Sequence, residues 1–151
     1  MFPKYLESSK DNTGTDNNEL IEIACNTAVD LSGYRIALVN GRWGGIYKTL
    51  PISEMCFDFV VVSAVGMQNA SPRGIVLYDA NDGIVDSLSY EGDLTILGWD
   101  LKDIGVSESS STPIGFSLQK SGAGCVGSDF QWIEPSTATP GTLNNSQNIE
   151  C

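Results

Sequence analysis

Histidine is absent from this 151-residue chain. Without an imidazole, the protein lacks the side chain that most often serves as a general base, activates a serine or cysteine nucleophile, or binds zinc. This absence is the strongest argument that the protein is not an enzyme.

Long apolar runs are absent too. The longest candidate, Phe57 to Met67, contains Asp58 and Ser63 and is shorter than the roughly 20 residues that a membrane helix needs.

Positive charge is scarce. The chain has 8 Lys and Arg residues against 19 Asp and Glu residues, which gives a formal net charge of −11. Affinity for nucleic acid rests largely on contacts of Lys and Arg with phosphates, so this balance opposes a nucleic-acid partner. The acidic residues are spread along the sequence, which favours simple solubility, cation binding or life in a salty medium.

The four cysteines include no CxxC pair, which argues against a zinc site and in favour of disulfides. Four cysteines allow three pairings. We favour Cys25 with Cys56, which end and begin predicted strands, and Cys125 with Cys151, because that bond would fasten the tail. The alternative is four free thiols in a cytosolic protein. An even number of cysteines suits an oxidising compartment, so we expect an extracellular or cell-surface location.

The length and composition favour one domain over residues 1–151. Hydrophobic residues make up 41% of the chain, which is enough for a globular core. The opening residues, Met1 to Tyr5, lack the basic start and apolar core of a signal peptide. Either the chain is a mature fragment of an exported protein with an added Met, or it is not exported, and we favour the fragment.

Alternating apolar and polar residues, separated by Gly, Pro, Asn and Asp, predict an all-β fold. Because these turn residues recur at short intervals, we expect a β-sandwich of about eight or nine strands rather than a parallel sheet. The predicted strands are Phe2–Glu7, Leu20–Ala24, Tyr34–Val39, Ile46–Leu50, Phe57–Ala64, Ile75–Asp79, Ile84–Tyr90, Gly115–Ser121 and Phe130–Ile133.

Several segments, in the same order along the chain, resemble the lamin tail domain. They are Glu19–Tyr34, Gly74–Tyr90, Gly115–Lys120, Asp129–Trp132 and Ala138–Asn144, so the resemblance covers about residues 19–144. It implies an immunoglobulin-like β-sandwich that acts as a non-catalytic module. The segment from Asp103 to Pro113 resembles the version attached to secreted bacterial nucleases and phosphatases, whose chemistry belongs to a separate catalytic domain.

Two acidic or amide-rich loops are candidates for calcium. The first, between Ser8 and Asn18, offers Asp11, Asp16 and Asn18, because calcium takes six to eight oxygen ligands. The alternative for this loop is a solvated segment without a metal. The second, Asp79–Gly83, lacks the downstream Glu of a calcium loop, and we interpret it as a hairpin turn. Beyond this possible calcium, the sequence implies no cofactor.

Two tryptophans are the candidate ligand-binding residues. Trp43 and Trp99 lie in predicted loops, and the second belongs to a long loop from Gly92 to Pro113. A large rigid indole can stack on a sugar ring or anchor a protein partner; alternatively, each could fold back over the end of the sandwich. We expect Trp132, which alternates with Phe130, to lie in the core.

These features favour an extracellular binding or anchoring module that recognises a surface, a glycan or a protein partner through its end loops. The alternative is a structural subunit that self-assembles into an extracellular layer or filament, through edge strands or a bond from Cys151. A catalytic protein is the third hypothesis, which the missing histidine opposes.

Overall fold

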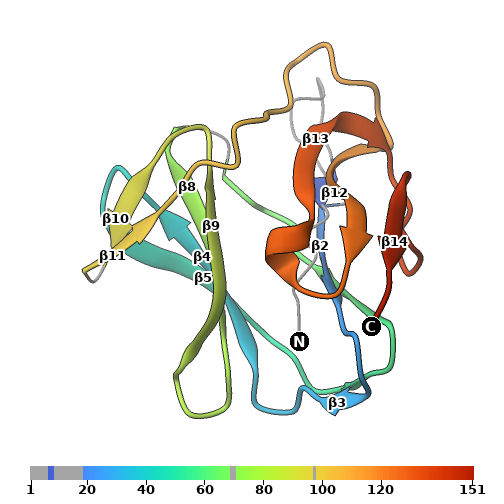
Figure 1. Cartoon of the computed structure of the whole chain (residues 1–151). Coiled ribbons are helices and arrows are strands. Elements are labelled where there is room, and N and C mark those ends of the chain that lie inside the picture. Colours follow the sequence, from blue (N-terminus) through green and yellow to red (C-terminus); the bar gives the residue numbers. More distant parts are fainter. Residues whose placement is uncertain (1–6, 9–18, 69–70, 97) are drawn as a thin grey trace.

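Strands dominate the protein. The computed structural model describes residues 7–8, 19–68, 71–96 and 98–151, and these contain fourteen strands and one short 3₁₀ helix, η1 (Gly127–Asp129) (Figure 1). The predicted all-β class is therefore confirmed. None of the described residues forms a helix long and apolar enough to cross a membrane.

The first layer is a four-stranded antiparallel sheet. Its order is β5 (Gly45–Pro51), β4 (Arg35–Asn40), β8 (Arg73–Tyr78) and β9 (Ile84–Tyr90). Side chains alternate between the two faces of a strand, so Ile36 and Leu38 point to one face of β4 while Ala37 and Val39 point to the other. All four are fully buried. This sheet is therefore covered on both faces.

The second layer combines two groups of strands. The first pairs β12 (Phe116–Gly124) with β1 (Glu7–Ser8), β13 (Gln131–Thr137) and, in parallel, β14 (Gln147–Ile149). The second pairs β2 (Leu20–Ala24) with β7 (Phe59–Ser63), and β1 lies against β2. Figure 1 shows these strands facing the first sheet across the molecule.

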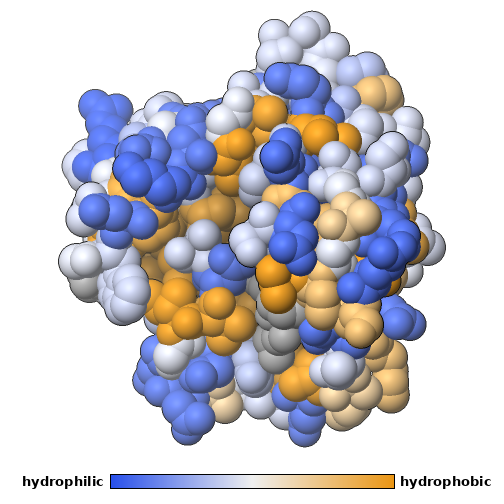
Figure 2. Space-filling model, in the orientation of Figure 1, coloured by the Kyte–Doolittle hydropathy of each residue, from blue (hydrophilic) through white to orange (hydrophobic). Residues whose placement is uncertain are grey.

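Apolar side chains fill the space between the layers. The main cluster joins Ile21 and Ile23 of β2 and Val60 of β7 to residues of the opposite sheet. Those opposite residues include Ile36, Leu38, Ile75, Leu77, Leu88 and Tyr90. Trp132 is partly buried against this cluster, as expected for a core residue. The arrangement is a β-sandwich, and Figure 2 shows apolar residues along the region between the layers, with hydrophilic residues around them.

One end of the sandwich is closed by a turn and a disulfide. The Ser32 amide donates to Oδ1 of Asp30 at 2.9 Å, and Gly33 takes a φ of 84°, a conformation that favours glycine. Next to this turn, β3 (Val29–Asp30) pairs with β6 (Met55–Cys56).

The continuous strand predicted over Phe57–Ala64 is wrong at its start, because the chain bends at 57–58 before β7 pairs with β2.

The prediction of one long loop from Gly92 to Pro113 is also wrong. The segment contains an antiparallel hairpin of β10 (Leu94–Ile96) and β11 (Trp99–Leu101), so Trp99 begins a strand. The hairpin forms because its apolar residues cover the outer face of the first sheet. Of the predicted strand Phe2–Glu7, only Glu7 lies within the described residues, where it pairs with Leu118 of β12.

Candidate functional site

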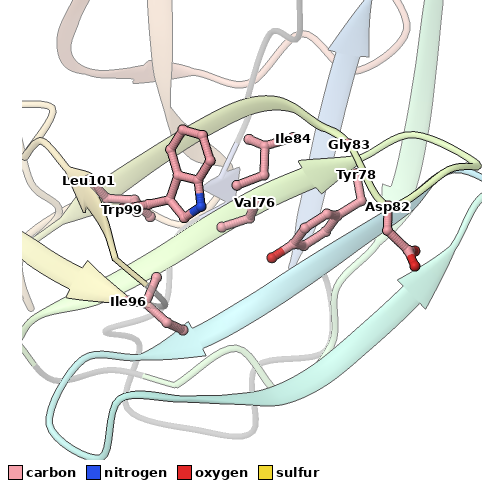
Figure 3. A pocket seen from close by; sticks show the side chains of 8 residues that line it. All are labelled: Val76, Tyr78, Asp82, Gly83, Ile84, Ile96, Trp99 and Leu101. Atoms are coloured by element: carbon pink, nitrogen blue, oxygen red, sulfur yellow. The ribbon is translucent and has the colours of Figure 1, made fainter.

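A groove lies where the β10–β11 hairpin meets the end of the first sheet (Figure 3). Its volume is about 470 Å³, within the range of roughly 300–1,000 Å³ that is typical of small-ligand sites. The residues that line it are Val76, Tyr78, Asp82, Gly83, Ile84, Ile96, Trp99 and Leu101. Half of these residues are aliphatic, and Trp99, Tyr78 and Asp82 contribute the polar side-chain atoms.

Apolar packing places the hairpin over the sheet. Leu94, Ile96 and Leu101 of the hairpin pack against three outward-facing residues of β4 and β8, which are Ala37, Val39 and Val76. All six side chains are buried. At roughly 25 cal/mol for each Å² of apolar surface removed from water, such packing fixes a short hairpin that could not form alone. The groove therefore has a rigid wall.

Glycine allows the hairpin to approach closely. A Cβ atom at Gly74 of β8 would lie 3.0 Å from a methyl carbon of Leu94 and 3.0 Å from one of Leu101. It would also lie 3.3 Å from the carbonyl oxygen of Leu88. A side chain here would force these leucine side chains to shift by a few tenths of an ångström, so Gly74 helps to set how closely the hairpin packs on the sheet.

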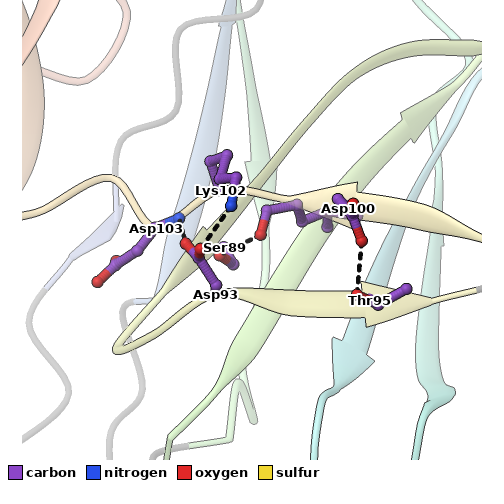
Figure 4. A network of polar contacts seen from close by, with 7 residues as sticks. Ser89, Asp93, Thr95, Asp100, Lys102 and Asp103 are labelled. Carbon is purple, nitrogen blue, oxygen red and sulfur yellow. Dashed lines mark hydrogen bonds and ion pairs between the residues drawn. The ribbon is translucent and has the colours of Figure 1, made fainter.

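Polar contacts hold the base of the hairpin (Figure 4). The Asp93 carboxylate accepts from Nζ of Lys102 at 2.7 Å and from the amide of Asp103 at 2.8 Å. These contacts lower the pKa of Asp93, the Lys102 side chain being the larger cause, and Asp93 in turn raises the pKa of Lys102. Across the hairpin, the Thr95 hydroxyl donates to Asp100 at 2.6 Å.

The hairpin is also joined to the sheet edge. The Ser89 hydroxyl of β9 donates to the carbonyl of Leu101 at 3.1 Å. The Ser89 amide donates to the carbonyl of Lys102, and the Ile104 amide donates back to the carbonyl of Ser89. The segment after β11 thus pairs with the end of β9 and carries the hairpin with it.

Trp99 forms the exposed side of the groove. Trp99 is 58% exposed, whereas Val76, Ile96 and Leu101 of the same lining are buried. Figure 3 shows the indole beside Val76, with its nitrogen on the side where the Tyr78 hydroxyl lies. An aromatic face and two polar groups therefore border the same apolar floor.

An ion pair closes the far end of the groove. Arg35 of β4 sits over the Tyr78 ring, 4.3 Å from its centroid, and its Nη1 lies 2.6 Å from Oδ1 of Asp82. Asp82 belongs to the β8–β9 turn, in which Oδ1 of Asp79 accepts from the amides of Asn81 and Gly83, each at 2.8 Å. The Asp79–Gly83 segment is therefore a hairpin turn, as interpreted from the sequence.

Trp43 lies apart from the groove lining. It belongs to the β4–β5 connection, where Oδ1 of Asn40 accepts from the amides of Arg42 at 3.0 Å and Trp43 at 3.2 Å. Trp43 is 79% exposed, so its side chain does not fold back over the sandwich. The two candidate tryptophans are thus both exposed; Trp99 lines the groove, and Trp43 does not.

Both favoured disulfides are present. Cys25 bonds to Cys56 and Cys125 bonds to Cys151, with Cα–Cα distances of 6.2 and 5.0 Å. Nδ2 of Asn26 contacts Sγ of Cys125 at 3.6 Å, so the two bonds lie at the same end of the protein. A second cavity of about 390 Å³ lies between them, lined by Cys25, Asn26, Asp58, Phe59, Leu143, Ile149 and Cys151. Two intramolecular disulfides suit an oxidising environment.

The calcium hypothesis stays a prediction. Asp11, Asp16 and Asn18 lie outside the described residues. Within the described ranges, no group of three or more acidic or cysteine side chains is placed to hold a metal ion. Glu19, which follows the candidate loop, has its carboxylate engaged by the amides of Gly66 and Met67.

Comparisons of the chain with protein-family models, curated proteins and solved structures found no match. The groove therefore has to be interpreted from its own residues. Sequence reasoning identified Trp99 but missed Tyr78, Ile96 and the Arg35–Asp82 pair. The available signal was the unbroken apolar run Ile36–Val39, which is typical of a strand buried on both faces and implies that something covers the outer face.

Proposed function

We propose that the protein is a non-catalytic extracellular module that binds or anchors to a surface, a glycan or a protein partner through the Trp99 groove. The observation that carries this proposal is a large exposed indole beside a groove of about 470 Å³ on a rigid hairpin. Tryptophan is enriched at binding hot spots because its ring buries a large area at a small cost in conformational entropy.

The fixed shape of the groove supports a role in binding. Its floor comes from buried residues of two packed strand pairs, and its base is held by the contacts of Asp93 and Ser89. A preformed site avoids the free-energy cost of ordering loops when a ligand binds. Module and ligand could therefore associate with little rearrangement of the protein.

The sequence and the disulfides support the proposed fold family and an extracellular location. The sequence segments between Glu19 and Asn144 that resemble the lamin tail domain, and follow one another in the same order, favour an immunoglobulin-like sandwich of that kind. The two disulfides and the scarcity of basic residues favour an exported protein without a nucleic-acid partner. In this proposal the module positions a hydrolase or another attached domain.

The test is a binding screen with three matched variants. The wild-type protein, Trp99→Ala, Trp43→Ala and Phe57→Ala are passed over immobilised polysaccharides and cell-surface proteins. Phe57 is a suitable control because it is an aromatic residue that is 66% exposed and does not line the groove. We expect retention that Trp99→Ala removes and Phe57→Ala leaves unchanged. Equal retention of all variants would contradict the assignment to the groove.

The second candidate function is a subunit that assembles with its own copies. One observation favours it: among the described strands, β13 pairs only with β12 and so presents a free edge. The cross-link from Cys151 is less favoured, because this cysteine is bonded to Cys125 of its own chain. Light scattering after size exclusion separates the two functions, since a module stays monomeric and a subunit forms a defined oligomer.

A further inference from the structure

We propose that the ligand of the Trp99 groove is an uncharged sugar, held with the apolar face of one pyranose ring against the indole. This inference rests on the function proposed above and specifies its ligand. It follows from the charge, the shape and the hydrogen-bonding groups of the groove.

Charge is balanced within the groove. Asp82 is the one charged side chain in the described lining, and its carboxylate is paired with Arg35 at 2.6 Å. No Lys or Arg belongs to that lining, and Arg35 at its far end is already paired with Asp82, so no unpaired positive charge would offset the repulsion between an acidic glycan and a protein of net charge −11. A neutral ligand meets neither repulsion nor an unpaired buried charge.

The walls combine an aromatic face with hydroxyl-binding groups. A pyranose ring has C–H groups on one face, which can pack on an indole, and hydroxyls around its rim. Trp99 supplies the face, and its indole nitrogen lies on the side of the ring toward Val76 and the Tyr78 hydroxyl (Figure 3). Indole nitrogen donates only, whereas a phenol both donates and accepts, so the two groups suit adjacent sugar hydroxyls.

The surroundings favour a sugar over an apolar protein anchor. Asp82, Thr95 and Asp100 are exposed near the groove and the hairpin. A protein interface usually surrounds its anchor with a broad region of excluded water, which such exposed polar residues do not provide. A sugar leaves its outer hydroxyls in water and needs only the groove itself.

The experiment is affinity electrophoresis in gels that contain one soluble polymer each. Hydroxyethyl cellulose and dextran are the neutral probes, polygalacturonate is the acidic probe, and chitosan is the cationic probe. Salt of about 0.1 M and about 1 M distinguishes the classes, because a high salt concentration screens charge contacts and leaves stacking intact. We expect retardation by at least one neutral polymer, with the same dissociation constant at both salt concentrations.

The variants locate the contact. Trp99→Ala should weaken binding by about 30-fold or more, the size expected for a tryptophan hot spot. Trp99→Phe keeps an aromatic face and should recover part of the affinity. Phe57→Ala should bind like the wild type. Circular dichroism and thermal melting of each variant separate a lost contact from a lost fold.

The possible failures are distinguishable. Retardation by the acidic or cationic polymer that salt abolishes and Trp99→Ala removes would overturn the neutral ligand and keep the groove. Trp99-dependent binding to a purified surface protein, without binding to any polysaccharide, would also overturn the sugar as ligand and keep the groove as the binding site. Neutral-polymer binding that is unchanged in Trp99→Ala would overturn both the ligand contact and the groove assignment. No Trp99-dependent binding to any probe would overturn the inference together with the proposed function.

Discussion

Removing the two disulfides one at a time should produce unequal losses of stability. Cys25 and Cys56 are 31 residues apart, and Cys125 and Cys151 are 26 residues apart. In the chain-entropy model these closed loops are worth roughly 3.7 and roughly 3.5 kcal/mol, so loop length alone predicts nearly equal effects.

Burial makes the difference. Cys25 and Cys56 are 4% and 0% exposed and belong to the main core cluster, whereas Cys151 is exposed. Replacing the first pair by Ala therefore also removes two packed sulfur atoms and leaves space in the core, at a further cost of at least about 1 kcal/mol. We expect the double variant of Cys25 and Cys56 to lose roughly 5 kcal/mol and that of Cys125 and Cys151 roughly 3.5 kcal/mol.

Urea unfolding followed by tryptophan fluorescence measures both losses. The free energy of unfolding is compared after extrapolation to water, since removing a cross-link also expands the unfolded chain and raises the slope. Ser variants of Cys125 and Cys151 serve as controls, because those sulfurs are less buried. Equal losses for the two pairs, or a larger loss for Cys125 and Cys151, would refute the reasoning from burial.

Three further changes test other parts of the structure. Under mild reductant, alkylation and mass spectrometry should find Cys151 labelled before Cys25, because only the former is exposed. Gly74→Ala should lower the free energy of unfolding by about 1–3 kcal/mol and weaken binding at the groove, because the new methyl group presses on the hairpin; thermal melting and affinity gels report the two effects. Burial raises the pKa of Asp86 above 3.8, so its contribution to stability is complete below 3.8 and is lost as pH rises through the raised value. Asp86→Asn should therefore exceed the wild type in melting temperature near neutral pH, and this advantage should shrink toward about pH 3.

Local pattern was sufficient to locate much of the sheet structure. The predicted bounds of β2 and β9 agree with the structure, and β4 differs by one residue at each end. These strands have at least five residues, are rich in apolar residues and end at turns whose chemistry is visible in the sequence. The turn that ends at Gly33 is an example, because Asp30 and glycine each have a defined local role there.

The groove depends on contacts that local pattern cannot show. Strands β10 and β11 have three residues each, too few for an alternation to be recognised. They exist because Leu94 and Leu101 cover Ala37 and Val76, which are distant in the sequence. The sequence therefore identified Trp99 as a candidate ligand-binding residue but could not place it beside Tyr78.

The sheet edges bear on the choice between a binding module and a self-assembling subunit. At the end of β9, the amide and carbonyl of Ser89 are already paired with Lys102 and Ile104, so that part of the edge is closed to another chain. Strand β13 has an open edge but contains Pro135, which has no amide hydrogen for pairing with another strand. Natural sandwiches use both devices against edge-to-edge association. The same segment that closes β9 also carries the hairpin beside the groove, which favours a monomer that binds a ligand over a building block.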